Sequence, residues 1–168
     1  MPPKDSLGIL SPGNSEKRDE LLRMLETAYW MEIETVMNYI ANSINPDGVT
    51  AREIVEALEQ DIDEELSHAR QFGARIKELY GVVPGSIGFS PEQKQLQPPE
   101  RQTDLVHVVK GVIEAEKGAI EHYNRIIEFC EGLDWVTQDM VIAILRDEEG
   151  HRRLFEGFLS EFEADGKA

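Results

Sequence analysis

The chain has 168 residues, of which 40% are hydrophobic, and its formal net charge is −16. This length and hydrophobicity suffice for one compact domain with a substantial core, and they exclude an intrinsically disordered chain. The acidic balance argues against nucleic acid as a partner, because direct binding to it needs a basic surface.

The sequence shows neither a membrane span nor a secretion signal. No apolar run is long enough to cross a bilayer. Residues 1–5 lack the apolar segment that a signal peptide carries. The only cysteine is Cys130, which excludes an intrachain disulfide and a Cys-x-x-Cys metal knuckle. We therefore expect a cytoplasmic protein without a membrane partner.

The first predicted helix carries one acidic residue on its apolar face. Residues 1–15 are rich in Pro, Gly and Ser and predict a flexible N-terminal arm. A helix is then predicted from about Ser15 to Ser43, with an apolar stripe that includes Tyr39. Glu32 lies on this stripe, whereas Glu34 is predicted on the opposite, polar side. A buried Glu is rare unless it is paired or bound to a metal ion.

The second predicted helix begins at Thr50, which opens a capping box, and ends near residue 81. It carries a Glu-x-x-His pattern, Glu65 and His68, whose side chains share one face because they are three residues apart. Asp61 lies on the same stripe one turn earlier. It either guides a metal ion toward Glu65 and His68 or pairs with a neighbour.

A long connection precedes the second half of the chain. Residues 81 to about 102 are rich in Pro and Gly, and a connection of this length can carry the chain from one end of a bundle to the other. A third helix is predicted from near Thr103 to near Gly132, with Glu116 on its stripe. A fourth, from about residue 137 to 163, carries a second Glu-x-x-His, Glu148 and His151. Residues 164–168 are expected to be a frayed tail.

The two halves repeat one plan: a helix with a lone inward Glu, then a helix with Glu-x-x-His. The Glu-to-Glu spacing is 33 residues in the first half and 32 in the second. Tyr39 and Tyr123 each lie seven residues after the lone Glu. The repeat predicts an all-α, pseudo-twofold four-helix bundle over residues 16–163, with a long crossover between helices two and three.

The inward residues have the composition of a two-metal site. Four carboxylates carry −4, which two divalent cations balance, and burying them without metal would cost several kcal/mol per uncompensated charge. Mixed oxygen and nitrogen ligands favour iron or manganese over calcium or zinc–thiolate chemistry. The pattern is that of di-iron and di-manganese carboxylate bundles. The predicted metal ligands are Glu32, Glu65, His68, Glu116, Glu148 and His151.

Position assigns a role to each residue. Glu65 and Glu148 are predicted to bridge the metals, and the other four ligands to bind one metal each. Glu64 and Asp147 directly precede the bridging residues; they either orient the histidines or are plain surface acids. Tyr39 and Tyr123 either hydrogen-bond a ligand carboxylate, supply an electron, or are core tyrosines. Two further histidines are expected to be solvated: His107 and His122.

Residues from about 20 to 160 resemble the ferritin-like superfamily, in particular bacterioferritins and Dps-like mini-ferritins with a bacterioferritin-type site. The segment DMVIAILRDEEGH at 139–151 is similar to the fourth helix of bacterioferritin, and ELSHA at 65–69 is similar to its second-helix motif. Tyr39 falls where bacterioferritins keep a tyrosine beside the di-iron site. The resemblance implies a ferroxidase with two iron ions per subunit that oxidises Fe(II) with O2 or H2O2 and stores Fe(III) in a shell; manganese is the alternative metal.

The chain also departs from these families. Leu66 stands where bacterioferritins place a haem-ligating methionine, so haem is not expected. There is no room for the fifth helix of 24-subunit cages, which favours a homo-oligomer of 12 subunits or fewer. The alternative function is a peroxide-scavenging di-iron or di-manganese protein, a peroxidase or manganese-catalase-like protein that stores no iron. A third candidate function is metal buffering without catalysis.

Overall fold

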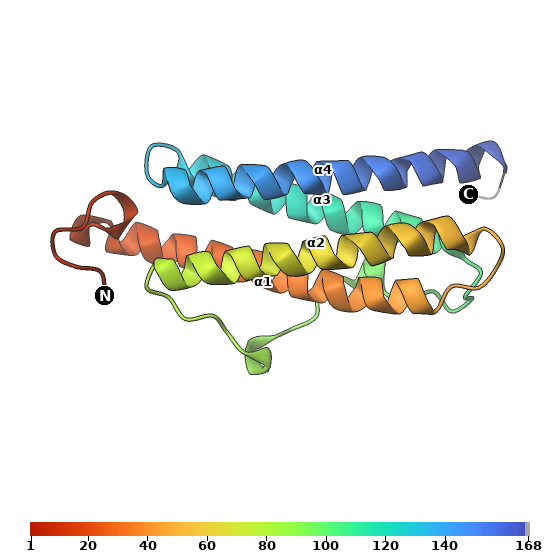
Figure 1. Ribbon diagram of the computed structural model, residues 1–168, viewed down its shortest axis with the longest axis horizontal. Helices are drawn as coiled ribbons and strands as arrows, with labels where there is room; N and C mark the ends of the chain where they lie inside the picture. The colour runs from red at the N-terminus through yellow and green to blue at the C-terminus, as the bar shows by residue number, and fades with distance from the viewer. Residues whose placement is uncertain (167–168) are drawn as a thin grey trace.

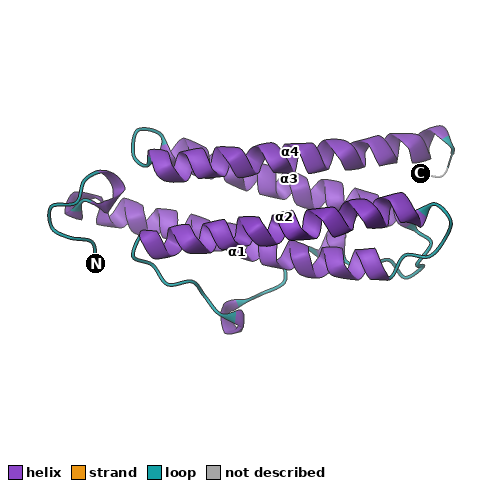
Figure 2. Ribbon diagram, in the orientation of Figure 1, coloured by secondary structure: helices purple, strands orange, loops and turns teal. Residues whose placement is uncertain are grey.

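The computed structural model describes residues 1–166. They form four long α-helices and four short 3-10 helices, without a strand in this range (Figures 1 and 2). The all-α four-helix prediction is therefore confirmed. Over the same residues, no helix has the length and apolar character needed to cross a membrane. The long helices are α1 (Ser15–Ile44), α2 (Ala51–Glu78), α3 (Leu105–Cys130) and α4 (Trp135–Ala164).

The long helices form two antiparallel hairpins, α1 with α2 and α3 with α4, which lie side by side (Figure 1). Between them the crossover leaves the end of α2, runs along the outside of α1 and reaches the far end of the bundle (Figure 1). Helices α2 and α3 therefore run in the same direction. Two short 3-10 helices interrupt the crossover, Ser86–Gly88 and Lys94–Leu96.

The apolar core is split into two clusters with the predicted site between them. The first contains Leu25, Phe72 and Ile144, and the second contains Leu58, Val109 and Phe155. Along each long helix, the inward Glu or Glu-x-x-His lies between residues of one cluster and residues of the other. The periodic stripes bury their apolar members at both ends of the bundle, and this leaves the acids and histidines facing one another at the middle.

The starts of two helices are held by aspartate caps. The side chain of Asp104 accepts a hydrogen bond from the backbone of His107 at 3.1 Å, and that of Asp134 accepts one from Thr137 at 3.2 Å. The predicted capping box at Thr50 does not form, because its side chain makes no cap hydrogen bond. Its backbone is already close to helical, at φ −94° and ψ −2°, rather than extended as a capping residue requires.

Part of the N-terminal arm is docked onto the bundle. Residues Gly8–Leu10 and Pro12–Asn14 form 3-10 helices, and Ile9 is buried in the first core cluster. The Asn14 side-chain amide donates to the Gly8 carbonyl at 2.8 Å. This segment of the N-terminal arm therefore packs against the bundle through Ile9. Helix α4 ends at Ala164. Of the predicted frayed tail, residues 167–168 lie outside the described residues.

Candidate metal centre

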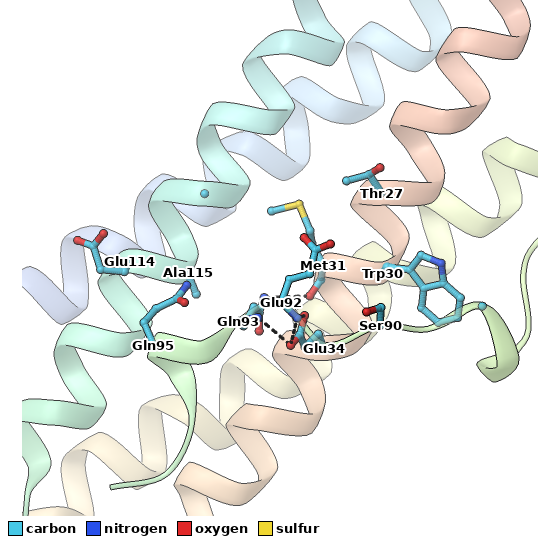
Figure 3. A pocket seen from close by; sticks show the side chains of 12 residues that line it. Thr27, Trp30, Met31, Glu34, Ser90, Glu92, Gln93, Gln95, Glu114 and Ala115 are labelled. Carbon is cyan, nitrogen blue, oxygen red and sulfur yellow. Dashed lines mark hydrogen bonds between the residues drawn. The ribbon is translucent and has the colours of Figure 1, made fainter.

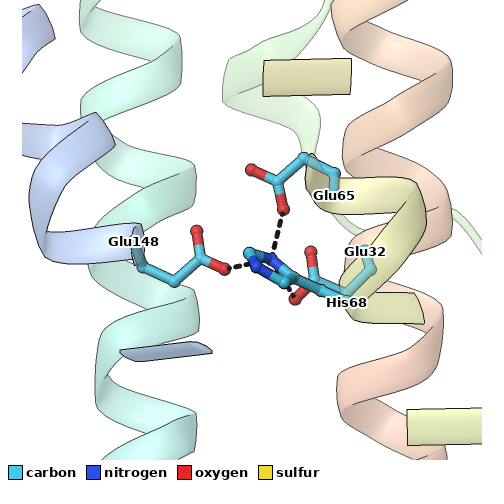
Figure 4. A group of neighbouring side chains, drawn as sticks. All are labelled: Glu32, Glu65, His68 and Glu148. Atoms are coloured by element: carbon cyan, nitrogen blue, oxygen red, sulfur yellow. Dashed lines mark ion pairs between the residues drawn. The ribbon is translucent and has the colours of Figure 1, made fainter. Parts of the chain in front are cut away.

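Six side chains from all four helices meet at the middle of the bundle in two overlapping groups. One group is Glu32, Glu65, His68 and Glu148 (Figure 4), and the other combines Glu65 and Glu148 with Glu116 and His151. Within each group, one ligand atom per residue lies within 4.8 Å of the others, and every member is buried. Glu65 and Glu148 belong to both groups, which is the arrangement expected of two bridging carboxylates. The structure thus brings together all six residues singled out from the sequence.

Several polar atoms in this cluster are buried without a hydrogen-bond partner. They include both carboxylate oxygens of Glu65, Oε1 of Glu148, and Nδ1 of His68 and of His151. The His68 Nδ1 lies 3.1 Å from Glu148 Oε1, and the His151 Nδ1 lies 3.3 Å from Glu65 Oε1, without hydrogen-bond geometry. Unsatisfied buried polar atoms are destabilising. Two divalent cations between these atoms would satisfy them, so the donor set fits a two-metal site.

The outer nitrogen of each histidine faces an acid from the other Glu-x-x-His helix. The Nε2 atom of His151 lies 3.0 Å from Glu64 Oε2, and that of His68 lies 3.4 Å from Asp147 Oδ2. A carboxylate at Nε2 favours the tautomer that keeps its proton there and leaves Nδ1 free to bind a metal ion. The structure therefore places Glu64 and Asp147 where the orienting role requires them.

Two tyrosines each reach across the pseudo-twofold axis. The Tyr39 hydroxyl on α1 donates a hydrogen bond to Glu116 on α3, and the Tyr123 hydroxyl on α3 donates one to Glu32 on α1. Burial, followed by the charge of Glu116, raises the pKa of Tyr39 well above its usual value. For Tyr123, burial and the charge of Glu32 have the same effect. Both hydroxyls are therefore neutral donors at neutral pH.

Without metal, the site holds protons. Burial opposes charge on the imidazoles, but the close carboxylates of Glu148 and Glu65 outweigh this effect and raise the pKa of His68 to about 10 and that of His151 to about 12. Burial also raises the pKa of the Glu32 carboxyl well above its usual value, with Glu65 and Glu148 adding to the shift. Metal binding must therefore displace protons from these groups.

A cavity of about 320 Å³ lies between α1, α3 and the crossover (Figure 3). Met31 and Ala115 line this cavity, and they also line the small space beside the glutamates of the site. The cavity wall carries carboxylates from Glu34, Glu92 and Glu114. The cavity and the candidate centre are therefore adjacent on the α1–α3 side, with Met31 and Ala115 between them.

Two residues lie where sequence periodicity did not place them. Glu34, predicted on the polar side of its helix, is buried and accepts hydrogen bonds at 2.8 Å from the backbone N–H groups of Glu92 and Gln93 (Figure 3). His122, expected to be solvated, is buried with Nε2 2.8 Å from the Met24 carbonyl. The contact of Glu34 comes from the crossover and that of His122 from the packing of α3 against α1, neither of which is encoded by the periodicity of a single helix. His107 is exposed, as expected.

Comparison with known proteins agrees with this architecture. The "DNA protection during starvation protein" of Pyrococcus furiosus is 29% identical over 145 residues, covering 84% of this chain and 78% of that protein. The bacterioferritin of Desulfovibrio desulfuricans is 25% identical over 146 residues, covering 86% of this chain and 77% of that protein. The solved structure of a dodecameric thioferritin from Bacteroides fragilis has a TM-score of 0.77 at 23% identity, covering 89% of this chain and 90% of that one, and supports the fold.

The sequence profile of the ferritin-like domain spans residues 22–164. This range contains all four long helices except the first turns of α1, and all six residues of the candidate metal centre. The resemblance noted from the sequence motifs is therefore confirmed: the chain belongs to the ferritin-like family.

Proposed function

We propose that the protein is a ferroxidase that oxidises Fe(II) to Fe(III) at the six-residue centre. The observation that carries this proposal is the pair of overlapping ligand groups, whose shared carboxylates have unpartnered buried oxygens. Two Fe(II) ions are the substrate. Together they release two electrons, which reduce O2 to H2O2, or H2O2 to two waters, with two protons taken up in either case. The same residues would accept Mn(II).

Each residue has a defined task in this proposal. Glu65 and Glu148 hold both ions and fix their separation, and the terminal ligands hold one ion each: Glu32 and His68, or Glu116 and His151. Four carboxylates balance the charge of two Fe(II) ions, so the added positive charge of Fe(III) is stabilised by an environment that is already negative. Glu64 and Asp147 keep the imidazoles in the ligand tautomer.

We also propose a catalytic role for Tyr39 as a donor of one electron when the centre holds a single Fe(II). One electron from that Fe(II) and one from Tyr39, which also loses its phenolic proton, would reduce H2O2 to two waters with one further proton, leaving Fe(III) and a neutral tyrosyl radical. Replacing Tyr39 with phenylalanine is expected to slow Fe(II) oxidation roughly ten-fold, because it removes both the electron donor and the hydrogen bond to Glu116. The parent should show a tyrosyl radical by electron paramagnetic resonance after oxygen exposure, and the Tyr39→Phe variant should not. Tyr123→Phe is the matched control, which loses the equivalent bond to Glu32. A radical that persists in Tyr39→Phe would rule out the electron role.

The assembly that we propose is a homo-oligomeric shell of 12 subunits or fewer that stores Fe(III). The Bacteroides fragilis neighbour is dodecameric by its description. The Pyrococcus furiosus relative is named for DNA protection, but the net charge of −16 opposes DNA binding by this chain. Haem is not part of the proposal, because Leu66 carries no ligand atom.

Anaerobic Fe(II) titration followed by oxygen exposure tests the function, on protein sized by light scattering. We expect two Fe(II) per chain, fast oxidation on exposure, and then uptake of many more iron atoms per assembly. Binding of two metals per chain without further uptake, on a small oligomer, would instead favour the peroxide-scavenging alternative. A chain that binds no Fe(II) at this centre would contradict both functions.

A further inference from the structure

Between Leu58 and Phe72, the buried positions of α2 that have buried counterparts on α4 match them, except at one position. A spacing of 83 residues relates Glu65 to Glu148 and His68 to His151, and the same spacing relates further members of the inward stripe. Where α2 has Asp61, α4 has Ile144, and both side chains are buried. The flanking inward positions pair like with like: Leu58 with Val141, and Phe72 with Phe155.

Asp61 faces only one of the two halves of the centre. Its Oδ1 atom lies 3.6 Å from Nε2 of His151, and its Oδ2 atom is buried without a hydrogen-bond partner. Glu64 approaches the same Nε2 at 3.0 Å. His151 therefore has two carboxylates at its outer nitrogen. Among the ion pairs of the described residues, His68 has one carboxylate there, from Asp147 at 3.4 Å.

We propose that Asp61 makes the two metal positions unequal, so that the position formed by Glu116 and His151 has the higher affinity for a divalent cation. The inference rests on the proposed two-metal function. A buried carboxylate is costly without a partner, and a cation bound across the imidazole ring offsets that cost, because opposite charges attract more strongly in a medium of low dielectric constant. A carboxylate at Nε2 also makes Nδ1 a stronger ligand. Ile144 supplies neither effect to the other position.

Anaerobic Co(II) titration followed by visible absorption tests this asymmetry without any oxidation step. Glu32→Ala leaves the His151 position with its ligands, and Glu116→Ala leaves the His68 position with its own. We expect Co(II) to bind roughly ten-fold more tightly to the Glu32→Ala variant than to the Glu116→Ala variant, a typical size for a partner that orients a ligand.

Adding Asp61→Asn, which preserves shape, should lower affinity roughly ten-fold in the Glu32→Ala background and leave the Glu116→Ala background nearly unchanged. Asp63→Asn is the matched control, because it removes the same charge from an exposed position on the same helix. Circular dichroism on each variant verifies that the bundle is intact.

Co(II) titration of the parent protein provides a second measurement, in which no metal-binding side chain is removed. Its two Co(II) steps should lie roughly ten-fold apart, converge in Asp61→Asn and separate further in Asp147→Asn, which weakens the His68 position. Equal steps in the parent, or equal weakening of both steps by Asp61→Asn, would overturn the inference. If the parent does not bind two Co(II) ions, both this inference and the proposed function are wrong. If it binds two Co(II) ions with affinities that Asp61→Asn leaves unchanged, the inference alone is wrong.

Discussion

Replacing Glu65 with alanine is expected to slow Fe(II) oxidation by more than roughly 100-fold and to abolish binding of the second ion. Glu65 belongs to both ligand groups, so its loss removes a donor from each metal position at once. It also leaves Nδ1 of His151 without its 3.3 Å carboxylate neighbour. Stopped-flow oxidation kinetics and anaerobic Fe(II) titration measure the two effects.

The same loss is expected for Glu148→Ala, because Glu148 is the shared carboxylate from α4. Neighbouring acids provide matched controls, since Glu59 and Glu149 are exposed on the same two helices. Glu59→Ala and Glu149→Ala should oxidise Fe(II) at the parent rate. If both Glu65→Ala and Glu148→Ala matched the parent rate, the assignment of the centre would be wrong.

Removing bound metal with a chelator is expected to lower the melting temperature by roughly 10–30 °C. An ion present at about 100 to 1,000 times its Kd stabilises the fold by about 3–4 kcal/mol. For a chain of this size, each kcal/mol shifts Tm by about 2–4 °C. Two ions per chain produce the expected range. Differential scanning calorimetry on the Mn(II)-loaded and chelated protein measures it, and Glu65→Ala should show a much smaller difference.

The difference in Tm should widen as the pH rises. The folded pKa of His68 is raised to about 10 from 6.5, so its protonation stabilises the metal-free protein below pH 6.5, and this contribution is lost as the pH approaches 10. The raised pKa of the Glu32 carboxyl acts in the same direction. Metal binding, which displaces these protons, is favoured over the same range. A difference in Tm that narrowed between pH 6.5 and pH 9 would contradict this account.

The apolar stripes of the helices predicted most residues of the candidate metal centre, because helical periodicity is a local property of the chain. Residues three or four apart share a face whatever surrounds the helix. Glu32, Glu65 and Glu116 could therefore be assigned to the interior from their own helices, and the 33- and 32-residue spacings indicated two matched hairpins. The helix ends were predicted to within about three residues, whereas the predicted cap at Thr50 does not form, because its backbone is closer to helical than a cap allows.

The tertiary structure decided which helix meets which. No spacing along the chain shows that Tyr39 donates to Glu116 of the opposite hairpin, or that Asp61 faces His151. Those contacts depend on how the two hairpins pack. Likewise, Glu34 is buried because the crossover lies over it and supplies backbone N–H donors.

The sequence by itself determined that this chain is a four-helix bundle with six inward acidic and histidine residues in two matching halves, because both features follow from repeats along single helices. Only the tertiary structure decided that the halves are unequal. The pairing of Asp61 with His151 joins residues 90 positions apart, and their contact depends on the packing of two helices rather than on the pattern of either.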